Sequence, residues 1–427
     1  MSDKKIAPVR CIRGQVHLPG DKSISHRALI LAAIAEGDSE ITGISTAQDV
    51  RNTMQCLRDL GIDIEEKGDK IIVHGKGKYG LSQPKGVLDA GNSGTTIRLL
   101  SGILAAQNFV TTIDGDESLR NRPMRRIIEP LQSMGAHIES NGYKAPLTIR
   151  GHQLKAIDYA STIASAQVKS CILLAGLYAS GMTRVTEPAQ SRDHTERMLV
   201  EFGALARCTQ SGAGVRGPAD LHPCNIDVPG DISAAAFFLV AACILPDSAI
   251  KLFNVGINPT RTGILDALAA MGAQVSKTDA TTVNNEPRAT LEARSSRLRA
   301  TNLGGSMIPR IIDEIPILAV AATQADGITV IRDAQELRVK ETDRIEATVV
   351  NLKRMGANVR DTKDGMVITG PSKLKGAEID SYNDHRIAMS FTIAGLIAQG
   401  ETIIDKADCV DISFPGFFEI LDSVNCD

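Results

Sequence analysis

Residues 18–27 read LPGDKSISHR and residues 228–237 read VPGDISAAAF, so the same turn occurs twice in the chain. In each copy Pro-Gly is followed by Asp, a common helix N-cap residue, and then by residues that suit a helix. The first copy carries cationic side chains where the second carries apolar ones: Lys22, His26 and Arg27 against Ile232, Ala236 and Phe237. The start of the helix is therefore repeated, whereas its charge is not.

A second pattern recurs around these turns, namely an amphipathic helix, a glycine and a short alternating strand, as in CLRDLGIDIE (56–65) and NLKRMGANVR (351–360). The glycine suits the residue after a helix end, where φ is positive. These glycines lie about 70 residues apart, at Gly61, Gly135, Gly203, Gly272 and Gly356, and ILDSVNCD (420–427) forms a frayed sixth copy with Asn425 in the glycine position. Six units, three for each Pro-Gly-Asp turn, predict two similar α/β domains.

The length of 427 residues also favours two domains, since it exceeds what one core usually supports. The second trio of units begins near residue 230, and the strand-like segment 10–19 has no helix of its own. We therefore expect one domain over 21–229 and a second made of 1–20 plus 230–427, with a hinge near residues 20 and 230. The first would carry most anion-binding residues and the second the acid–base residues.

The composition is that of an ordinary soluble protein, with 43% hydrophobic residues, 23% charged residues and a net charge of −3. Neither this charge nor the low aromatic content of 3% favours a nucleic-acid partner. Eight scattered cysteines without a CxxC pair indicate a reducing compartment. The N-terminus does not resemble a signal peptide, and the apolar run 234–245 is too short to span a bilayer. We expect a cytoplasmic protein with no membrane partner.

The first predicted domain places polar donors at several helix starts, where free N–H groups favour an anion. Lys22, Ser23 and Arg27 follow the first turn, and the alternative, a capped helix with a basic first turn, would oppose the helix dipole. Further donors lie in DAGNSGTTIR (89–98), in the arginine-rich GDESLRNRPMRRIIEPL (115–131), in SAQVKS (165–170) with Ser165, Gln167 and Lys169, and in SRDHTERML (191–199) with Ser191, Arg192 and His194. Converging helix starts predict an anion-selective cleft, although no P-loop or GxGxxG pattern is present.

The second predicted domain carries candidate acid–base groups. Asp313 and Glu314 precede an apolar run, and Asp384, His385 and Arg386 precede another. LRVKETDRIEA (337–347) would place Lys340 and Arg344 on one helix face, where an anion could bridge them, or would form an alternating charged surface helix. No set of residues has convincing metal-ligand spacing. This set of residue types favours acid–base chemistry on phosphorylated or carboxylated small molecules.

Taken together, the motifs PGDKSISHR, GNSGTT-R, LRNRPM, SAQVKS, RDHTE, LRVKETDR and NDHR resemble those of 5-enolpyruvylshikimate-3-phosphate synthases (3-phosphoshikimate 1-carboxyvinyltransferases), and SAQVKS resembles the bacterial class II branch. The likeness runs from about residue 10 to residue 418. It implies the enolpyruvyl transferase fold, two domains of three βαβαββ units each, in a monomer without metal or organic cofactor. It implies transfer of the enolpyruvyl group of phosphoenolpyruvate to the 5-hydroxyl of shikimate 3-phosphate, with release of phosphate, in the shikimate pathway to aromatic amino acids.

The resemblance also implies roles for individual residues. Asp313 would take the 5-hydroxyl proton, Glu341 would serve proton transfer at the methylene carbon, and Lys22 and His385 would complete the catalytic set. Shikimate 3-phosphate would contact Lys22, Ser23, Arg27, Ser165, Ala166, Gln167, Arg192, Asp313 and Lys340. Phosphoenolpyruvate would contact Lys22, Asn92, Gly94, Arg122, Gln167, Arg344 and Arg386.

One position departs from the family pattern, because Ile412 stands where many relatives have a lysine before the C-terminal Phe-Pro. Gly94 occupies the small-residue position associated with glyphosate binding in this family. Two alternatives stay open at this point. One is the related transferase acting on UDP-N-acetylglucosamine, which has Lys-Asn where this chain has Lys22-Ser23. The other is a non-catalytic phospho-ligand binding protein in which Asp313 and Glu341 are structural.

Overall fold

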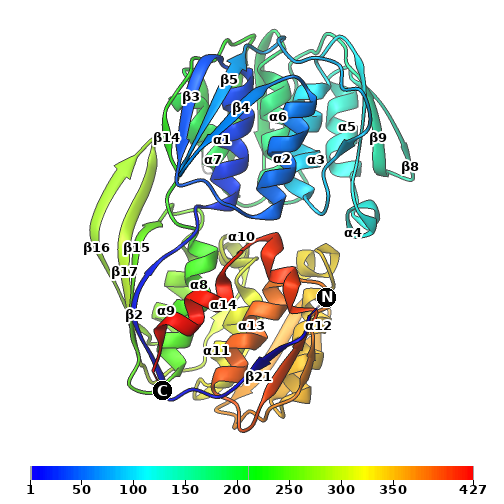
Figure 1. Cartoon of the computed structure of the whole chain (residues 1–427). Helices are drawn as coiled ribbons and strands as arrows, with labels where there is room; N and C mark the ends of the chain where they lie inside the picture. Colours follow the sequence, from blue (N-terminus) through cyan, green and yellow to red (C-terminus); the bar gives the residue numbers. More distant parts are fainter. Residues whose placement is uncertain (1, 210, 427) are drawn as a thin grey trace. The chain divides into compact units, whose positions relative to one another are not determined.

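Small sheets, each flanked by its own helices, account for most of the computed structural model, which describes residues 2–209 and 211–426 (Figure 1). Four of the sheets share one strand order. A short first strand pairs in parallel with the second, and the second pairs antiparallel with the fourth, which pairs with the third. In three of these sheets, those that begin with β6, β10 and β18, a helix follows the first strand and another follows the second, which gives the chain order βαβαββ. This recurrence confirms the predicted internal repeat of an α/β unit.

The chain divides into two compact units. Unit 2 consists of Gly20–Pro229 and the hairpin tip Thr282–Glu286. Its three sheets are formed by β14 (Ile226–Asp227), β3 (Glu36–Thr42), β5 (Lys70–Lys76) and β4 (Asp63–Lys67); by β6 (Leu88–Asp89), β7 (Val110–Asp114), β9 (Lys144–Arg150) and β8 (His137–Asn141); and by β10 (Asp158–Ala160), β11 (Gly181–Thr186), β13 (Gly212–Gly217) and β12 (Ala206–Thr209).

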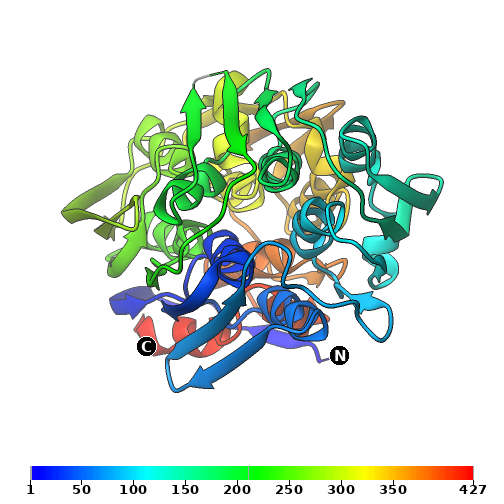
Figure 2. The same cartoon turned by 90° about the horizontal axis from the view of Figure 1, so that it is seen from above.

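The helices of unit 2 lie on the inner side of these sheets, which form its periphery in Figure 2. They are α1 (Lys22–Ile34), α2 (Gln48–Asp59), α3 (Gly94–Leu104), α4 (Glu117–Asn121), α5 (Arg125–Ser133), α6 (Ala166–Gly176) and α7 (His194–Glu201). The close packing of α3 against α6 depends on Gly102, because a Cβ atom there would lie 2.3 Å from the carbonyl oxygen of Cys171.

Unit 1 consists of the residues up to Pro19, Gly230–Thr281 and the residues from Pro287 onward. Its sheets are formed by β16 (Gln274–Val283), β17 (Glu286–Arg294), β15 (Ala249–Gly256), β2 (Cys11–His17) and β24 (Asn425–Cys426); by β18 (Asn302–Leu303), β19 (Gly327–Ile331), β21 (Gly365–Gly370) and β20 (Asn358–Thr362); and by β1 (Lys4–Ile6), β23 (Thr402–Asp405) and β22 (Glu378–Asp380).

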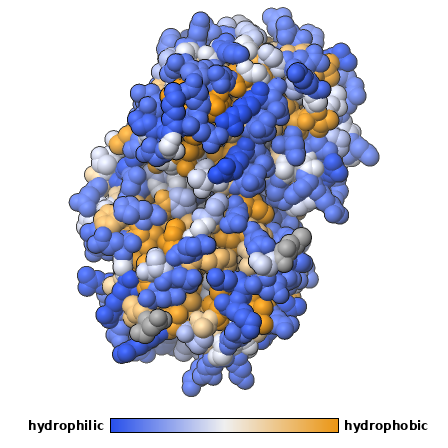
Figure 3. All heavy atoms as spheres, in the orientation of Figure 1, coloured by the Kyte–Doolittle hydropathy of each residue, from blue (hydrophilic) through white to orange (hydrophobic). Residues whose placement is uncertain are grey.

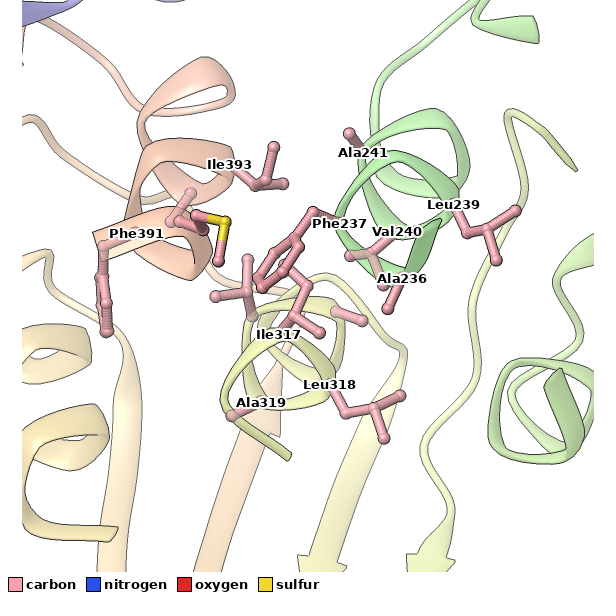
Figure 4. Packing of buried hydrophobic residues seen from close by; sticks show 14 of the residues in the cluster. Ala236, Phe237, Leu239, Val240, Ala241, Ile317, Leu318, Ala319, Phe391 and Ile393 are labelled. Atoms are coloured by element: carbon pink, nitrogen blue, oxygen red, sulfur yellow. The ribbon is translucent and has the colours of Figure 1, made fainter. Parts of the chain in front are cut away.

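The core of unit 1 lies between α8, α11 and α13, and Figure 4 shows Phe237 of α8 directed between the other two helices, near Ile317 and Ile393. The helices of this unit are α8 (Ile232–Ile244), α9 (Gly263–Ala270), η1 (Gly305–Met307), α10 (Ile308–Ile311), α11 (Ile315–Thr323), η2 (Gln335–Val339), α12 (Arg344–Arg354), α13 (His385–Leu396), η3 (Ala407–Ile412) and α14 (Phe417–Val424).

The two Pro-Gly-Asp turns lie where the chain passes from one unit to the other, between Pro19 and Gly20 and between Pro229 and Gly230. In each case the strand before the turn completes the first sheet of its own unit. Thus β2 pairs in parallel with β15 of unit 1, and β14 pairs in parallel with β3 of unit 2. The sheet that α1 or α8 packs against is therefore completed by a strand from a distant segment of sequence.

The predicted helix-ending glycines all adopt positive φ, with values of 86° at Gly61, 107° at Gly135, 89° at Gly203, 80° at Gly272 and 83° at Gly356. The expectation was wrong for the sixth copy, because Asn425 has φ −63° and continues directly into β24. That copy ends at residue 427, which lies outside the described residues.

Figure 3 shows mainly hydrophilic residues on the visible face of each unit. Among the described residues, no helix is long and apolar enough to cross a bilayer.

Candidate functional site

The predicted helix start at residues 21–23 is present in unit 2. The Asp21 carboxylate accepts a hydrogen bond from the backbone N–H of Ile24 at 2.9 Å and so caps α1. Lys22 and Ser23, the first two residues of the helix, are half-buried. The ammonium of Lys22 lies 2.9 Å from a carboxylate oxygen of Asp49 on α2, so this cation is held at the helix start by a neighbouring helix.

Arg27 is more deeply placed than its sequence position indicated. Its side chain is almost buried, and three of its N–H groups donate to Thr195 Oγ1 at 2.7 Å, Ser170 Oγ at 2.8 Å and the carbonyl oxygen of Ser23 at 2.9 Å. Burial lowers the pKa of Arg27 to about 10, while the nearby carboxylate of Glu196 opposes that shift. The guanidinium is therefore a fixed positive charge that joins α1 to α6 and α7.

His26, the neighbour of Arg27, was not assigned a role from the sequence, and the structure buries it completely. Its Nδ1 lies 2.6 Å from the hydroxyl of Thr53 on α2. Burial lowers the pKa of His26 well below its usual value, and the positive charges of Lys22 and Arg27 lower it further. His26 is therefore a neutral packing residue beneath the two cations.

The start of α3 brings together Asn92, Gly94 and Arg122, three residues that the resemblance assigns to phosphoenolpyruvate. Arg122 donates to the side-chain oxygen of Asn92 at 2.5 Å and to its carbonyl oxygen at 3.1 Å. A Cβ atom on Gly94 would lie 2.7 Å from Nη1 of Arg98 and 3.4 Å from Nη1 of Arg122, so the absent side chain leaves room for two guanidinium groups. Arg98 was quoted within a motif but given no role, and it was missed because it lies one turn inside the helix. Of the other arginines of 115–131, Arg120 and Arg125 are exposed: Arg120 pairs with Asp114 at 2.6 Å, and Arg125 stacks on Tyr143 at 4.2 Å. Arg126 is half-buried.

The start of α6 is linked to the same region through Gln167. Its side-chain oxygen accepts from Arg98 at 2.5 Å, and its amide donates to Thr95 Oγ1 at 3.0 Å. Ser165 caps α6, and its neighbour Ala166 is the first residue of the helix.

Two side chains suggested as donors at these helix starts are instead enclosed by protein. Lys169 is buried between carboxylates, and His194 of α7 is buried with Nδ1 2.7 Å from Glu286. Arg192, which precedes α7, is half-buried. The sequence does not show which side chains near a helix start are covered by a neighbouring element. For this reason Lys169 and His194 were both wrongly expected to be available as donors.

Unit 1 gathers cationic side chains around Asp313. Lys340 Nζ lies 3.3 Å and Arg344 Nη1 lies 3.4 Å from Oδ1 of this carboxylate, while Arg386 Nη2 at 3.9 Å and Arg261 Nη1 at 4.0 Å approach Oδ2. Arg386 also donates to the backbone carbonyl of Asp313 at 3.0 Å. Asp313 is thus the centre of four positive charges. Arg261 was missed because it stands alone in a loop after β15 without a repeated pattern.

Arg344 is enclosed by carboxylates, with a side chain only 1% exposed. It contacts both oxygens of Asp384, at 2.7 and 3.2 Å, and Oε2 of Glu341 at 2.6 Å. Burial opposes the charge, but Asp384, Glu341 and Asp313 together raise the pKa of Arg344 above its usual value. The expected shared helix face of Lys340 and Arg344 is wrong, because Lys340 follows η2 and Arg344 begins α12. The two side chains meet at Asp313 instead.

His385 and Arg386 open α13, and Asp384 caps it by accepting from the backbone N–H of Arg386 at 2.9 Å. The ring of His385 is buried. Glu314, next to Asp313, is also buried, and it contacts Ser233 Oγ and lies 3.7 Å from Arg386 Nη1. The variant position Ile412 ends η3.

Within the described residues, one group of side chains could bring three metal-ligand atoms together: Asp63, Glu65 and His74 on the β4–β5 hairpin. Asp63 is exposed and the other two are half-exposed. His74 also lies 2.7 Å from Asp38, and Glu65 pairs with Lys67, so this group forms a network of surface ion pairs.

Comparison with known proteins gives a consistent result. The family model described as EPSP synthase (3-phosphoshikimate 1-carboxyvinyltransferase) matches residues 6–421. Proteins named 3-phosphoshikimate 1-carboxyvinyltransferase from Geobacter sp. (strain M21) and Bacillus thuringiensis (strain Al Hakam) are 50% and 52% identical over 426 residues, which is 99% of this chain and of each relative. A solved EPSP synthase structure from Acinetobacter baumannii has a TM-score of 0.88 and 44% identity, and the match covers 99% of this chain and 98% of that one.

Proposed function

The chain belongs to the EPSP synthase family, and we propose that it transfers the enolpyruvyl group of phosphoenolpyruvate to the 5-hydroxyl of shikimate 3-phosphate and releases phosphate. The observation that carries this proposal is the position of Asp313 within 4.0 Å of four cationic side chains. A carboxylate so held offers a base for a hydroxyl proton, and fixed cations offer charge complementary to an anionic substrate. The matched relatives carry the name of the shikimate enzyme, so the UDP-N-acetylglucosamine alternative is not favoured.

Unit 2 would bind shikimate 3-phosphate through the starts of α1, α6 and α7. The side chains assigned to this substrate are Lys22, Ser23, Arg27, Ser165, Gln167 and Arg192, together with the backbone of Ala166. Arg27 supports the assignment, because a nearly buried guanidinium already joined to α6 and α7 offers a charge that needs no reorganisation when a phosphate binds. Unit 1 would add Asp313 and Lys340.

Phosphoenolpyruvate would be held by Lys22, Asn92, Gly94, Arg122 and Gln167 of unit 2 and by Arg344 and Arg386 of unit 1. The arrangement of Arg122 and Arg98 beside Gly94 supports this assignment, because it places two guanidinium groups against a helix N-terminus, where an anion is favoured. Arg344 would act from a position already paired with Asp384, so its charge would be oriented before the substrate binds.

The reaction would proceed by addition and elimination. Proton transfer from Glu341 to C3 of phosphoenolpyruvate makes C2 electrophilic, and Asp313 takes the 5-hydroxyl proton as the new C–O bond forms. The tetrahedral adduct then expels phosphate, which leaves as hydrogen phosphate with the proton that Asp313 had taken. C3 returns its proton to Glu341, and the cations, Lys22 among them, stabilise the charge on the leaving group. His385 would complete the shell of groups around these transfers.

We further propose that the units move as domains about the two passages near residues 20 and 230. Backbone hydrogen bonds hold the two passages side by side, from Asp21 N to Pro229 O at 2.7 Å and from Asp231 N to Pro19 O at 3.0 Å. Closure would exclude water from the reacting groups. A monomer in the cytoplasm is our proposal for the working form, and the eight free cysteines support a reducing compartment.

The function is tested by measuring phosphate release with each substrate alone and with both. We expect release only when phosphoenolpyruvate and shikimate 3-phosphate are present together, with equimolar formation of the enolpyruvyl ether identified by mass spectrometry. Phosphate release with UDP-N-acetylglucosamine as the acceptor would contradict the proposal. The absence of release with either acceptor would contradict it as well.

A further inference from the structure

Three charged side chains that have no part in the proposed reaction form a buried triad in unit 2. The ammonium of Lys169, on α6, lies 3.1 Å from Oε2 of Glu187 and 2.9 Å from Oε1 of Glu196, and it donates to the carbonyl oxygen of Ser191 at 3.3 Å. The three charged side chains are each at most 2% exposed. Burial alone would lower the pKa of Lys169, but the two carboxylates raise it, so the ammonium stays charged. Withdrawing such groups from water costs free energy, and well-packed apolar residues in their place often stabilise a fold at least equally. Stability alone therefore does not account for the triad.

The first carboxylate of the triad joins two segments that carry proposed substrate contacts. Oε1 of Glu187 accepts from the backbone N–H of Ser165 at 2.9 Å, where α6 begins. Oε2 accepts from the hydroxyl of Ser191 at 2.8 Å, one residue before Arg192. Glu187 therefore fixes the start of α6 relative to the segment that leads into α7.

The second carboxylate acts on the other side of the triad. Lys169 and Glu196 bridge α6 and α7. A residue adjacent to each, Ser170 after Lys169 and Thr195 before Glu196, forms a second bridge between hydroxyl oxygens 2.6 Å apart. Both of those hydroxyls accept from the guanidinium of Arg27. The ionic bridge thus sets the spacing of the two hydroxyls that orient Arg27.

We propose that Lys169 is a positioning residue for shikimate 3-phosphate, holding Ser165, Arg192 and Arg27 in one arrangement through Glu187 and Glu196. This inference rests on the proposed function. Lys169 does not touch the substrate, because its ammonium is directed at three oxygen atoms of the protein and is sealed from solvent. Lys169 as a positioning residue affects the KM for shikimate 3-phosphate alone. A purely structural triad would affect stability and would leave the ratio of the two KM values unchanged.

The test compares Lys169→Met with Lys78→Met, a matched change in unit 2 that removes a lysine paired with Asp220 at 2.7 Å. For Lys169→Met, assayed well below its unfolding temperature, we expect the KM for shikimate 3-phosphate to rise about tenfold or more. The KM for phosphoenolpyruvate should change less than about twofold, and Lys78→Met should change neither constant. An unchanged KM for shikimate 3-phosphate, or equal changes in both constants, would overturn the proposal.

A double variant separates positioning from stability. Lys169→Met/Glu196→Gln removes one charge of each sign, so it should recover part of the unfolding temperature and should fold if the single variant does not. We expect its KM for shikimate 3-phosphate to stay raised, and recovery of that constant along with the unfolding temperature would overturn the inference. The wild-type protein is assayed in parallel. If it releases no phosphate with both substrates, the proposed function fails; if it is active and the variants keep their affinity, only the role of Lys169 fails.

Discussion

The helices α1 and α8 begin with the same capped turn but differ in the side chains that follow it and in the contacts that these side chains make. Asp21 and Asp231 both accept a hydrogen bond from the first turn of their helix. Six residues further on, Arg27 joins α1 to α6 and α7 through hydroxyl groups, whereas Phe237 of α8 stacks edge-on against Phe417 of α14 at 5.9 Å. One position therefore bridges three helices by polar contacts in unit 2 and fills an apolar core in unit 1.

The comparison separates what the repeat requires from what was added to it. Unit 1 shows that the turn, the cap and the helix form without a cation at this position. A buried charge is therefore not needed to build the repeat, and Arg27, Lys22 and the Lys169 triad beside them call for a functional explanation. In unit 1 the charges are concentrated instead at Asp313 and Arg344, where α11, α12 and α13 begin.

The largest effect is expected from removing the base of unit 1. Asp313→Asn keeps the side-chain size but removes the proton acceptor, so kcat should fall by about 10²- to 10⁴-fold while shikimate 3-phosphate still binds. Steady-state kinetics and titration calorimetry measure the two quantities. Asp326→Asn, a change in the same unit at an exposed carboxylate, is the control. Near-normal turnover in Asp313→Asn would remove this residue from the base role.

The apolar copy of the turn is tested by Phe237→Ala. The cavity left between α8, α11 and α13 should lower the free energy of unfolding of unit 1 by about 3–5 kcal/mol, measured by urea denaturation. Both Michaelis constants should stay close to wild type, because Phe237 serves packing alone. Ile328→Ala, at a side chain that is 59% exposed, is the matched control. A selective loss of substrate affinity without loss of stability would contradict the structural role of this copy.

The serines that follow the two turns sharpen the comparison. Ser233 contacts the buried Glu314 and accepts from Arg261 at 2.7 Å, so Ser233→Ala leaves buried charges less well solvated and should cost about 1–3 kcal/mol of stability. Ser23 is half-buried at the proposed substrate site, so Ser23→Ala should change stability by less than about 0.5 kcal/mol and raise the KM for shikimate 3-phosphate. The opposite pattern, with Ser23 dominating stability, would reverse the assignment of the two copies.

The smallest effect concerns pH. Burial, Lys22 and Arg27 lower the pKa of His26, so the folded protein leaves it neutral while the unfolded chain protonates it near its ordinary pKa. Stability should therefore fall as pH drops below about 6.5, by at most about 1.4 kcal/mol per pH unit from this residue. His26→Gln should flatten that slope, measured by denaturation at several pH values, and His152→Gln, an exposed position, should not. Equal slopes in wild type and His26→Gln would show that His26 does not contribute.

Much of the fold could be predicted because the repeat leaves local signals. Gly61 and its four equivalents end helices with positive φ, and their spacing indicates six α/β units. The residues around Asp313 were indicated only as separate motifs. They come together because the starts of three helices of unit 1 lie close to one another. The burial of Lys169 and the contact of Arg261 with Asp313 were missed, because in both cases the partner residues lie far away in the sequence and come close only in the fold.

The central claim is that α1 carries an anion site added to a structural repeat. It is tested most directly by Arg27→Phe, which places the α8 residue in α1, with shikimate 3-phosphate binding measured by titration calorimetry in the absence of phosphoenolpyruvate. Loss of one charge-assisted contact should weaken binding by about 10- to 150-fold, while circular dichroism reports an intact fold. Wild-type affinity in folded Arg27→Phe would contradict the claim and would make Arg27 a structural residue like Phe237.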